Sequence, residues 1–139
     1  MAAIHGVHAA LVTPRRADAH EIDFGAALEL VDFACRSGCD GIVLLGSTGE
    51  FLHFDIDERL KLMRLAIKRS RVPVSVNVSH SSLEGALALA REAVSQGAAA
   101  LLLMPPYFFP YEQPDIQEFY LRFARAAGSR SRAQDRHHL

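Results

Sequence analysis

The chain has 139 residues, of which 50% are hydrophobic and 22% charged, and its formal net charge is −1. This length fits one domain with a substantial core, and the composition is ordinary for a soluble globular protein. The small net charge gives no basic surface for nucleic acid or an anionic membrane, and no apolar run approaches the roughly 18 residues of a spanning helix. The first residues lack the basic start and unbroken apolar centre of a signal peptide, so we expect a cytoplasmic protein.

Short apolar runs recur along the chain and predict four strands. They lie at residues 9–13, 41–45, 74–78 and 98–103, and each is bounded by glycine, proline or polar residues. Continuous apolar character without alternation is typical of strands that are covered on both faces, as in parallel sheets. The four runs therefore indicate a parallel sheet.

Each predicted strand is followed by an amphipathic helical pattern with its own start signal. Asp23 caps the first helix, Asp55 and Ser81 each begin a capping box, and Pro114 lies in the first turn of the fourth helix. Gly128 is expected to end that helix. The inward faces are predicted to be Phe24, Ala27, Leu28, Val31, Ala34 and Cys35; Ile56, Leu60, Met63 and Ile67; Ala86, Leu89, Ala90, Ala93 and Val94; and Ile116, Phe119, Tyr120, Phe123 and Ala127.

The resulting order is βαβαβαβα, with one strand every ~26 to 33 residues, the length of one βα unit. Two α/β architectures stay open, an open doubly wound sheet and the start of a (βα)8 barrel, which typically needs ~250 residues. A fifth strand is due near residue 129, but residues 129–139 contain no apolar run. We therefore expect a folded region at residues 1–128 and a polar, disordered tail at residues 129–139.

The most informative motif is Gly46-Ser-Thr-Gly-Glu50, directly after the second predicted strand. Gly46 and Gly49 permit a tight turn and close approach of a ligand, and parallel α/β folds bind ligands at the carboxyl ends of their strands. Ser47 and Thr48 place two hydroxyls at that end of the strand, so the loop is expected to form one wall of an active site. The alternative is that both hydroxyls cap their own loop. Glu50 is expected to accept hydrogen bonds from loop N–H groups.

Four features together resemble the N-terminal half of the dihydrodipicolinate synthase / N-acetylneuraminate lyase family of class I aldolases. They are Leu11-Val-Thr-Pro14, the Gly46–Glu50 motif followed by the acidic stretch Asp55–Arg59, Pro105-Pro-Tyr107, and Gln117-Glu-Phe-Tyr120. The resemblance covers about residues 6–128. It implies four βα units of a (βα)8 TIM barrel, a truncated half-barrel with parallel strands, in a family that is usually homotetrameric. No cofactor is expected.

The resemblance also implies a reaction, aldol formation or cleavage of a C–C bond. The family binds pyruvate or a related 2-keto acid as a Schiff base on a lysine of the sixth strand. Thr48 matches the hydroxyl that holds the carboxylate of the keto acid, between Gly46 and Gly49, and Ser47 matches a hydroxyl of the proton relay. Tyr107 matches a fourth-strand tyrosine that reaches into the relay of a neighbouring subunit in the synthases.

The chain lacks a residue that could serve as the Schiff-base lysine. Its only lysines, Lys61 and Lys68, lie seven apart on the second predicted helix, away from the apolar stripe. We therefore expect the chain to be inactive alone as a lyase or synthase. The alternative is a non-catalytic half-barrel that self-associates, or complements a separate C-terminal half, and binds a small carboxylate.

The remaining polar residues give weaker signals. The histidines form no metal-binding pattern, and Cys35 and Cys39 are expected to be buried reduced thiols rather than metal ligands. His80 is expected in a surface loop. Asn77 and Ser79 alternate near the end of the third strand, where they could face the interior of the barrel, and their role is open.

Overall fold

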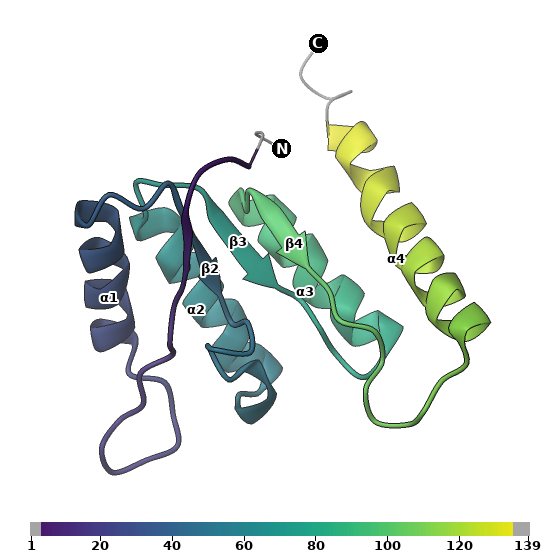
Figure 1. Cartoon of the computed structure of the whole chain (residues 1–139), viewed down its shortest axis with the longest axis horizontal. Coiled ribbons are helices and arrows are strands. Elements are labelled where there is room, and N and C mark those ends of the chain that lie inside the picture. Colours follow the sequence, from purple (N-terminus) through teal and green to yellow (C-terminus); the bar gives the residue numbers. More distant parts are fainter. Residues whose placement is uncertain (1–3, 135–139) are drawn as a thin grey trace.

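The computed structural model describes residues 4–134 and contains one parallel sheet (Figure 1). Its strands are β1 (His8–Ala10), β2 (Gly41–Leu44), β3 (Val74–Asn77) and β4 (Ala100–Leu102), hydrogen bonded in the order β1-β2-β3-β4. The predicted fold class and strand order are confirmed. The strands are shorter than predicted, although pairing continues beyond β1, where Leu11 N–H donates to the Val43 carbonyl at 3.0 Å.

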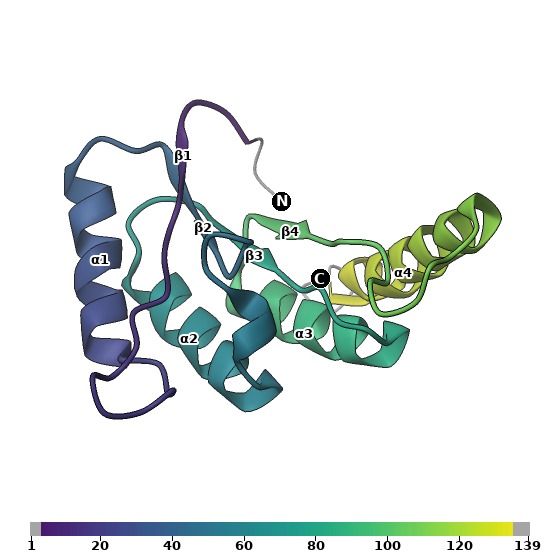
Figure 2. The ribbon, with the colours of Figure 1, turned by 60° about the horizontal axis from the view of Figure 1, so that its bottom comes forward.

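The helices are α1 (Phe24–Arg36), α2 (Ile56–Arg69), α3 (Leu83–Gln96) and α4 (Gln113–Gln134), with a short 3-10 turn η1 (Phe51–His53) before α2. Figures 1 and 2 show that the helices follow one another along one side of the sheet. A doubly wound sheet would have helices on both faces. Since the described helices cover a single face, the architecture is four βα units of a half-barrel.

Side-chain caps fix the starts of three helices. Asp23 accepts from the Ala26 N–H at 2.9 Å and Asp55 from the Glu58 N–H at 2.8 Å, as predicted. The third cap is Ser82, which accepts from the Gly85 N–H at 3.1 Å, so the prediction of Ser81 was wrong by one residue.

The core lies between the sheet and the helices. Val31 of α1, Val76 of β3 and Leu89 of α3 are at most 1% exposed. On α2 the predicted stripe was too narrow: Leu62 and Ala66 are also buried, because this helix packs against both α1 and α3 as well as the sheet. The predicted stripe residues Ile56, Leu60 and Ile67 lie half-buried at its flanks, and Met63 is fully buried.

The fourth helix is longer than predicted. Gly128 was expected to end it, but α4 continues to Gln134, so the helix extends into the predicted tail. Gly128 does not have the left-handed backbone that Gly97, with φ 93°, has at the end of α3. Residues 135–139 lie outside the described residues.

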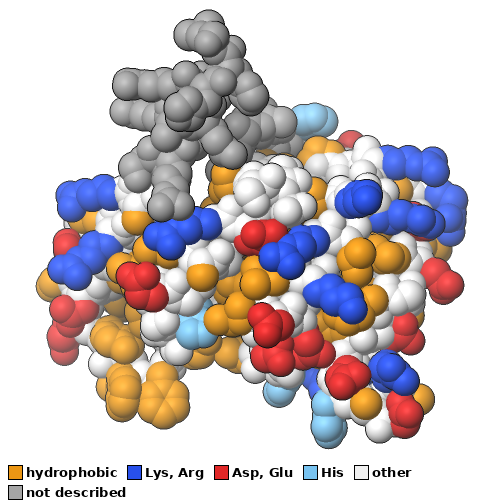
Figure 3. Space-filling model, turned by 180° about the vertical axis from the view of Figure 1, so that it is seen from behind, with side chains coloured by type: hydrophobic (Ala, Val, Ile, Leu, Met, Phe, Trp, Pro, Cys, Tyr) orange, Lys and Arg blue, Asp and Glu red, His pale blue; other side chains and the backbone are white. Residues whose placement is uncertain are grey.

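The two faces of the molecule differ in chemistry. Charged side chains of both signs cover the helical side (Figure 3). On the other side no described helix covers the sheet, and Val12 and Leu102 are 57% and 39% exposed. Within residues 4–134, no helix is both long enough and apolar enough to cross a membrane.

Candidate functional site

The Gly46–Glu50 loop begins at a strained residue. Leu45 is fully buried and has a left-handed backbone with φ 58°, which is unfavourable for a side chain that carries a Cβ. The loop then folds back: a Cβ on Gly49 would lie 2.9 Å from the Cα and N of Leu45. A glycine is therefore required at position 49. A Cβ on Gly46 would meet nothing within 4 Å, so the structure leaves open space there.

The hydroxyls of Ser47 and Thr48 are exposed at the end of β2. Within the described part of the chain, neither side chain makes a hydrogen bond, so the interpretation of these residues as caps of their own loop finds no support in the geometry. Two exposed hydroxyl donors beside the open space at Gly46 can bind an oxyanion.

Two contacts fix the loop to the segment that follows β1. The Thr13 hydroxyl donates to the buried Gly49 carbonyl at 2.7 Å. The Glu50 carboxylate lies 3.7 Å from the Arg15 guanidinium. Glu50 was expected to accept N–H bonds of the loop, but its described partner is Arg15, and its own N–H donates to the Ser47 carbonyl at 3.1 Å. The prediction of a structural role for Glu50 fits this ion pair, with a different partner.

Behind the loop lies a buried polar cluster of Arg59, Asn77 and Ser79. Asn77 donates its side-chain amide to the Leu45 carbonyl at 2.6 Å, and its oxygen accepts from the Ser79 N–H at 3.1 Å. The Arg59 Nη2 donates to the carbonyls of Asn77 at 3.2 Å and Ser79 at 2.9 Å. The Met104 N–H donates to the Ser79 hydroxyl at 2.8 Å. The cluster thus joins the carboxyl ends of β2, β3 and β4.

The sequence pointed to Asn77 and Ser79 but suggested no role for them. It did not indicate that Arg59, at the end of the acidic stretch Asp55–Arg59, belongs to the same cluster. Arg59 is 3% exposed, and burial lowers its pKa to about 10, so it is charged at neutral pH. Its guanidinium lies over the Phe51 ring, 5.2 Å from the centroid. Residue type gave no sign of this burial, because an arginine on a helix is usually exposed to solvent.

Tyr107 lies apart from the two hydroxyls. Its ring packs edge to face against Phe51, with centroids 6.1 Å apart, and it lines a pocket of about 330 Å³ together with Arg59 and His80. No hydrogen bond joins Tyr107 to Ser47 within the described residues. His80 follows β3, lies half-buried in this pocket rather than fully on the surface, and its Nδ1 accepts from the Ser82 N–H at 3.1 Å.

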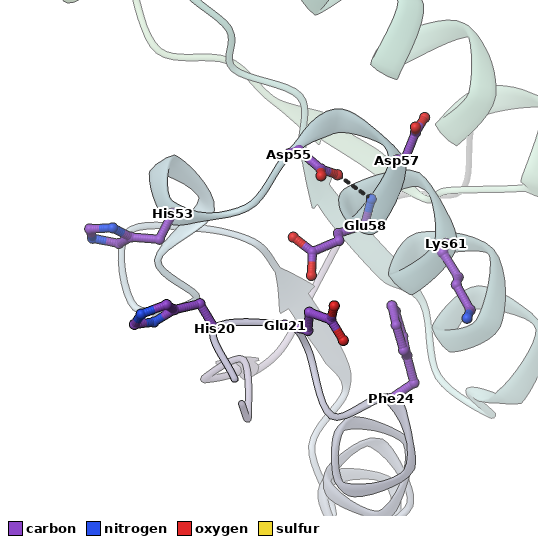
Figure 4. Close-up of a pocket in the computed structure, with 8 residues that line it drawn as sticks. All are labelled: His20, Glu21, Phe24, His53, Asp55, Asp57, Glu58 and Lys61. Carbon is purple, nitrogen blue, oxygen red and sulfur yellow. Dashed lines mark hydrogen bonds between the residues drawn. The ribbon is translucent and has the colours of Figure 1, made fainter. Parts of the chain in front are cut away.

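A second pocket, of about 390 Å³, lies between the loops that precede α1 and α2 (Figure 4). Two of its four carboxylates have structural partners: Asp55 caps α2, and Glu58 accepts from the Ile22 N–H at 3.1 Å. The described residues contain no group of three or more His, Cys, Asp or Glu side chains placed to hold a metal ion. Cys35 and Cys39 are free thiols and are half-buried rather than fully buried.

Both lysines lie on the outer side of α2. Lys61 Nζ lies 4.4 Å from the centroid of the Phe24 ring, and both Lys61 and Lys68 are exposed. Neither lies at the carboxyl end of a strand.

Comparison with known proteins identifies the arrangement. The model of the dihydrodipicolinate synthetase family matches residues 3–130. The chain belongs to this family. The resemblance inferred from the Gly46–Glu50 motif is thereby confirmed.

Individual members of the family match the chain over part of their own length. The 4-hydroxy-tetrahydrodipicolinate synthase of Thioalkalivibrio sulfidiphilus is 38% identical over 125 residues, which are 88% of this chain and 41% of that protein. A prophage protein of E. coli K12 from the dihydrodipicolinic acid synthase family, solved in complex with pyruvate, superimposes with a TM-score of 0.83 at 26% identity. That match covers 90% of this chain and 42% of the other.

A lyase structure matches equally well. The N-acetylneuraminate lyase of Mycoplasma synoviae superimposes with a TM-score of 0.82 at 26% identity, over 87% of this chain and 43% of the lyase. The chain therefore spans about two-fifths of the length of the family members it matches. It corresponds to their N-terminal half.

Proposed function

We propose that these 139 residues are the keto-acid-binding half of a Schiff-base lyase or synthase, in which Thr48, with the backbone of Gly46 and Gly49, holds the carboxylate of pyruvate or a related 2-keto acid. The observation that supports this is a pair of exposed hydroxyls that have no hydrogen-bond partner among residues 4–134, on a loop whose shape is fixed by Leu45 and Gly49. A pyruvate complex is known for the E. coli prophage relative.

Ser47 and Tyr107 are assigned to the proton relay of the complete enzyme. A relay needs hydroxyl groups that pass a proton between the imine and the second substrate. Ser47 is beside Thr48 on the loop. Tyr107 lies against Phe51, which follows the same loop, and its position at the exposed rim fits an assembly in which it serves a neighbouring subunit. These two roles rest on the family.

We also propose that these 139 residues have no lyase or synthase activity on their own. A Schiff-base lysine needs a lowered pKa from desolvation or neighbouring charge. Both lysines are exposed on α2, so neither has such an environment. Borohydride reduction of the purified chain with pyruvate, read by intact-mass analysis, should give no adduct. A stable adduct on Lys61 or Lys68 would contradict this part of the proposal.

Carboxylate binding is tested separately from chemistry. Titration of the ¹⁵N-labelled chain with pyruvate should shift the amide signals of residues 46–49, and Thr48→Val should raise the Kd roughly tenfold because one hydroxyl hydrogen bond to a charged group is lost. Ser81→Ala, at an exposed serine outside the loop, is the matched control and should leave the Kd unchanged. Equal effects of both variants would contradict the assignment of Thr48.

A second candidate function is a non-catalytic half-barrel that pairs with itself or with a separate C-terminal half. The observation that favours it is the open face, where Val12 and Leu102 are exposed and β1 and β4 each have an unpaired edge. Sedimentation and an activity assay together separate the two forms of this candidate: a defined dimer that binds pyruvate supports self-association, and a monomer that gains lyase activity only with a C-terminal half supports complementation.

A further inference from the structure

We propose that Asn77 is a positioning residue for the carboxylate-binding loop, acting through the peptide bond between Leu45 and Gly46. The inference rests on the proposed function, since it concerns the same loop. It assigns a role to a residue that contacts the loop from behind and does not touch the ligand.

The first step is the strain at Leu45. A left-handed backbone is unfavourable for a residue with a side chain and persists only where the surroundings impose it. At Leu45 the side chain is fully buried, and the carbonyl accepts the Asn77 side-chain amide at 2.6 Å. The next peptide N–H belongs to Gly46. The hydrogen bond from Asn77 therefore fixes the orientation of the peptide between Leu45 and Gly46. That orientation determines the direction of the Gly46 N–H, the first N–H of the loop.

The second step is that the orientation of the Asn77 side chain is determined by its other partners. Its oxygen accepts both the Ser79 N–H at 3.1 Å and the Ser79 hydroxyl, so the nitrogen must face Leu45. In addition, Arg59 donates to the main-chain carbonyl of Asn77, and the Ser79 hydroxyl accepts from the Met104 N–H. The side chain is 3% exposed. The Asn77 side chain thus forms a rigid connection between β3 and the start of the loop.

The third step is the choice of a variant that removes one bond. Asn77→Asp keeps the shape and both acceptor contacts with Ser79, but an ionised carboxylate cannot donate to the Leu45 carbonyl and repels it. Ser79→Ala is the matched control. It removes the hydroxyl contacts but keeps the main-chain N–H bond that orients Asn77.

The experiment compares both variants of the whole chain in ¹⁵N spectra with and without pyruvate. Asn77→Asp should shift the amides of residues 46–48 in the free chain and raise the Kd for pyruvate at least roughly tenfold, whereas Ser79→Ala should change the Kd by less than about threefold at a similar loss of Tm. Equal changes in both variants, in proportion to their Tm, would overturn the inference.

Two further readouts keep the test decisive. If Asn77→Asp does not fold, the side-chain amide signals of Asn77 in the unaltered chain are followed instead. They should move on addition of pyruvate, and unmoved signals would overturn the inference. If the unaltered chain binds no pyruvate, the proposed function fails. The amide shifts of residues 46–48 in ligand-free Asn77→Asp then still decide whether Asn77 orients the loop.

Discussion

The hydroxyl of Thr13 donates a buried hydrogen bond to the carbonyl of Gly49, across 36 residues of sequence and at a distance of 2.7 Å. It connects the segment after the first strand to the last glycine of the candidate carboxylate loop. Both residues are buried, so the carbonyl has no access to water when the bond is lost. This contact makes the loop part of the sheet edge and not a free segment.

Thr13→Val should therefore destabilise the chain by about 1–3 kcal/mol, the cost of a buried polar group left without a partner. Valine has the same shape, so packing is preserved. The measurement is the free energy of unfolding in urea. Thr13→Ser, which retains the hydroxyl, should recover most of the loss, and a valine variant as stable as the parent chain would show that water reaches Gly49.

The two glycines of the motif should respond differently to alanine. Gly49→Ala forces a Cβ to within 2.9 Å of the Leu45 backbone and 3.1 Å of the Leu11 carbonyl, so we expect a loss of about 1–3 kcal/mol from strain. Gly46→Ala adds a methyl group to open space and should change stability by less than about 1 kcal/mol. Thermal unfolding of the two variants provides the comparison, and a larger loss at Gly46 would contradict the observed loop path.

Much of the fold could be predicted because the signals are local. Asp23 and Asp55 cap helices by contacts with residues three positions ahead, and the apolar strand runs are continuous in sequence. The Gly46–Glu50 motif likewise identified the family from its own residues. A doubly wound sheet and a half-barrel differ in whether the helices lie on both faces of the sheet or on one. No local sequence pattern carries this information.

Two of the errors came from long-range contacts. Nothing near Arg59 in sequence indicates that its guanidinium reaches carbonyls 18 and 20 residues away. The width of the buried face of α2 depended on its neighbours α1 and α3. Gly128 was read as a helix end because glycine favours that position, yet the residue also fits within a helix at a cost of ~1 kcal/mol.

The ion pair between Asp32 and Arg69 predicts a pH dependence of stability. Arg69 donates hydrogen bonds from Nε and Nη2 to both oxygens of the Asp32 carboxylate, joining α1 to α2, and this lowers the pKa of Asp32 below its ordinary 3.8. A carboxyl whose pKa is lower in the folded state stabilises the fold above the unfolded pKa and loses that contribution as pH falls through the folded pKa.

Stability of the parent chain should therefore fall more steeply below pH 3.8 than that of Asp32→Asn. The measurement is Tm as a function of pH from neutral pH down to about pH 2. Arg69→Gln is the matched control, since it removes the other partner and should give the same shallow profile as Asp32→Asn. Parallel profiles for all three proteins would mean that solvent screens the pair completely.

Arg59 should be the most sensitive position of the polar cluster. Arg59→Met keeps roughly the length of the side chain and removes the buried positive charge. It also leaves the carbonyls of Asn77 and Ser79 without the guanidinium donor. Because two unpartnered buried acceptors outweigh the relief of desolvation, we expect a net loss of about 2–4 kcal/mol in urea unfolding. Arg59→Lys retains one cationic donor and should lose less, although an ammonium cannot reproduce the flat contact with the Phe51 ring. A methionine variant as stable as the parent would mean that desolvation of the guanidinium cancels its hydrogen bonds.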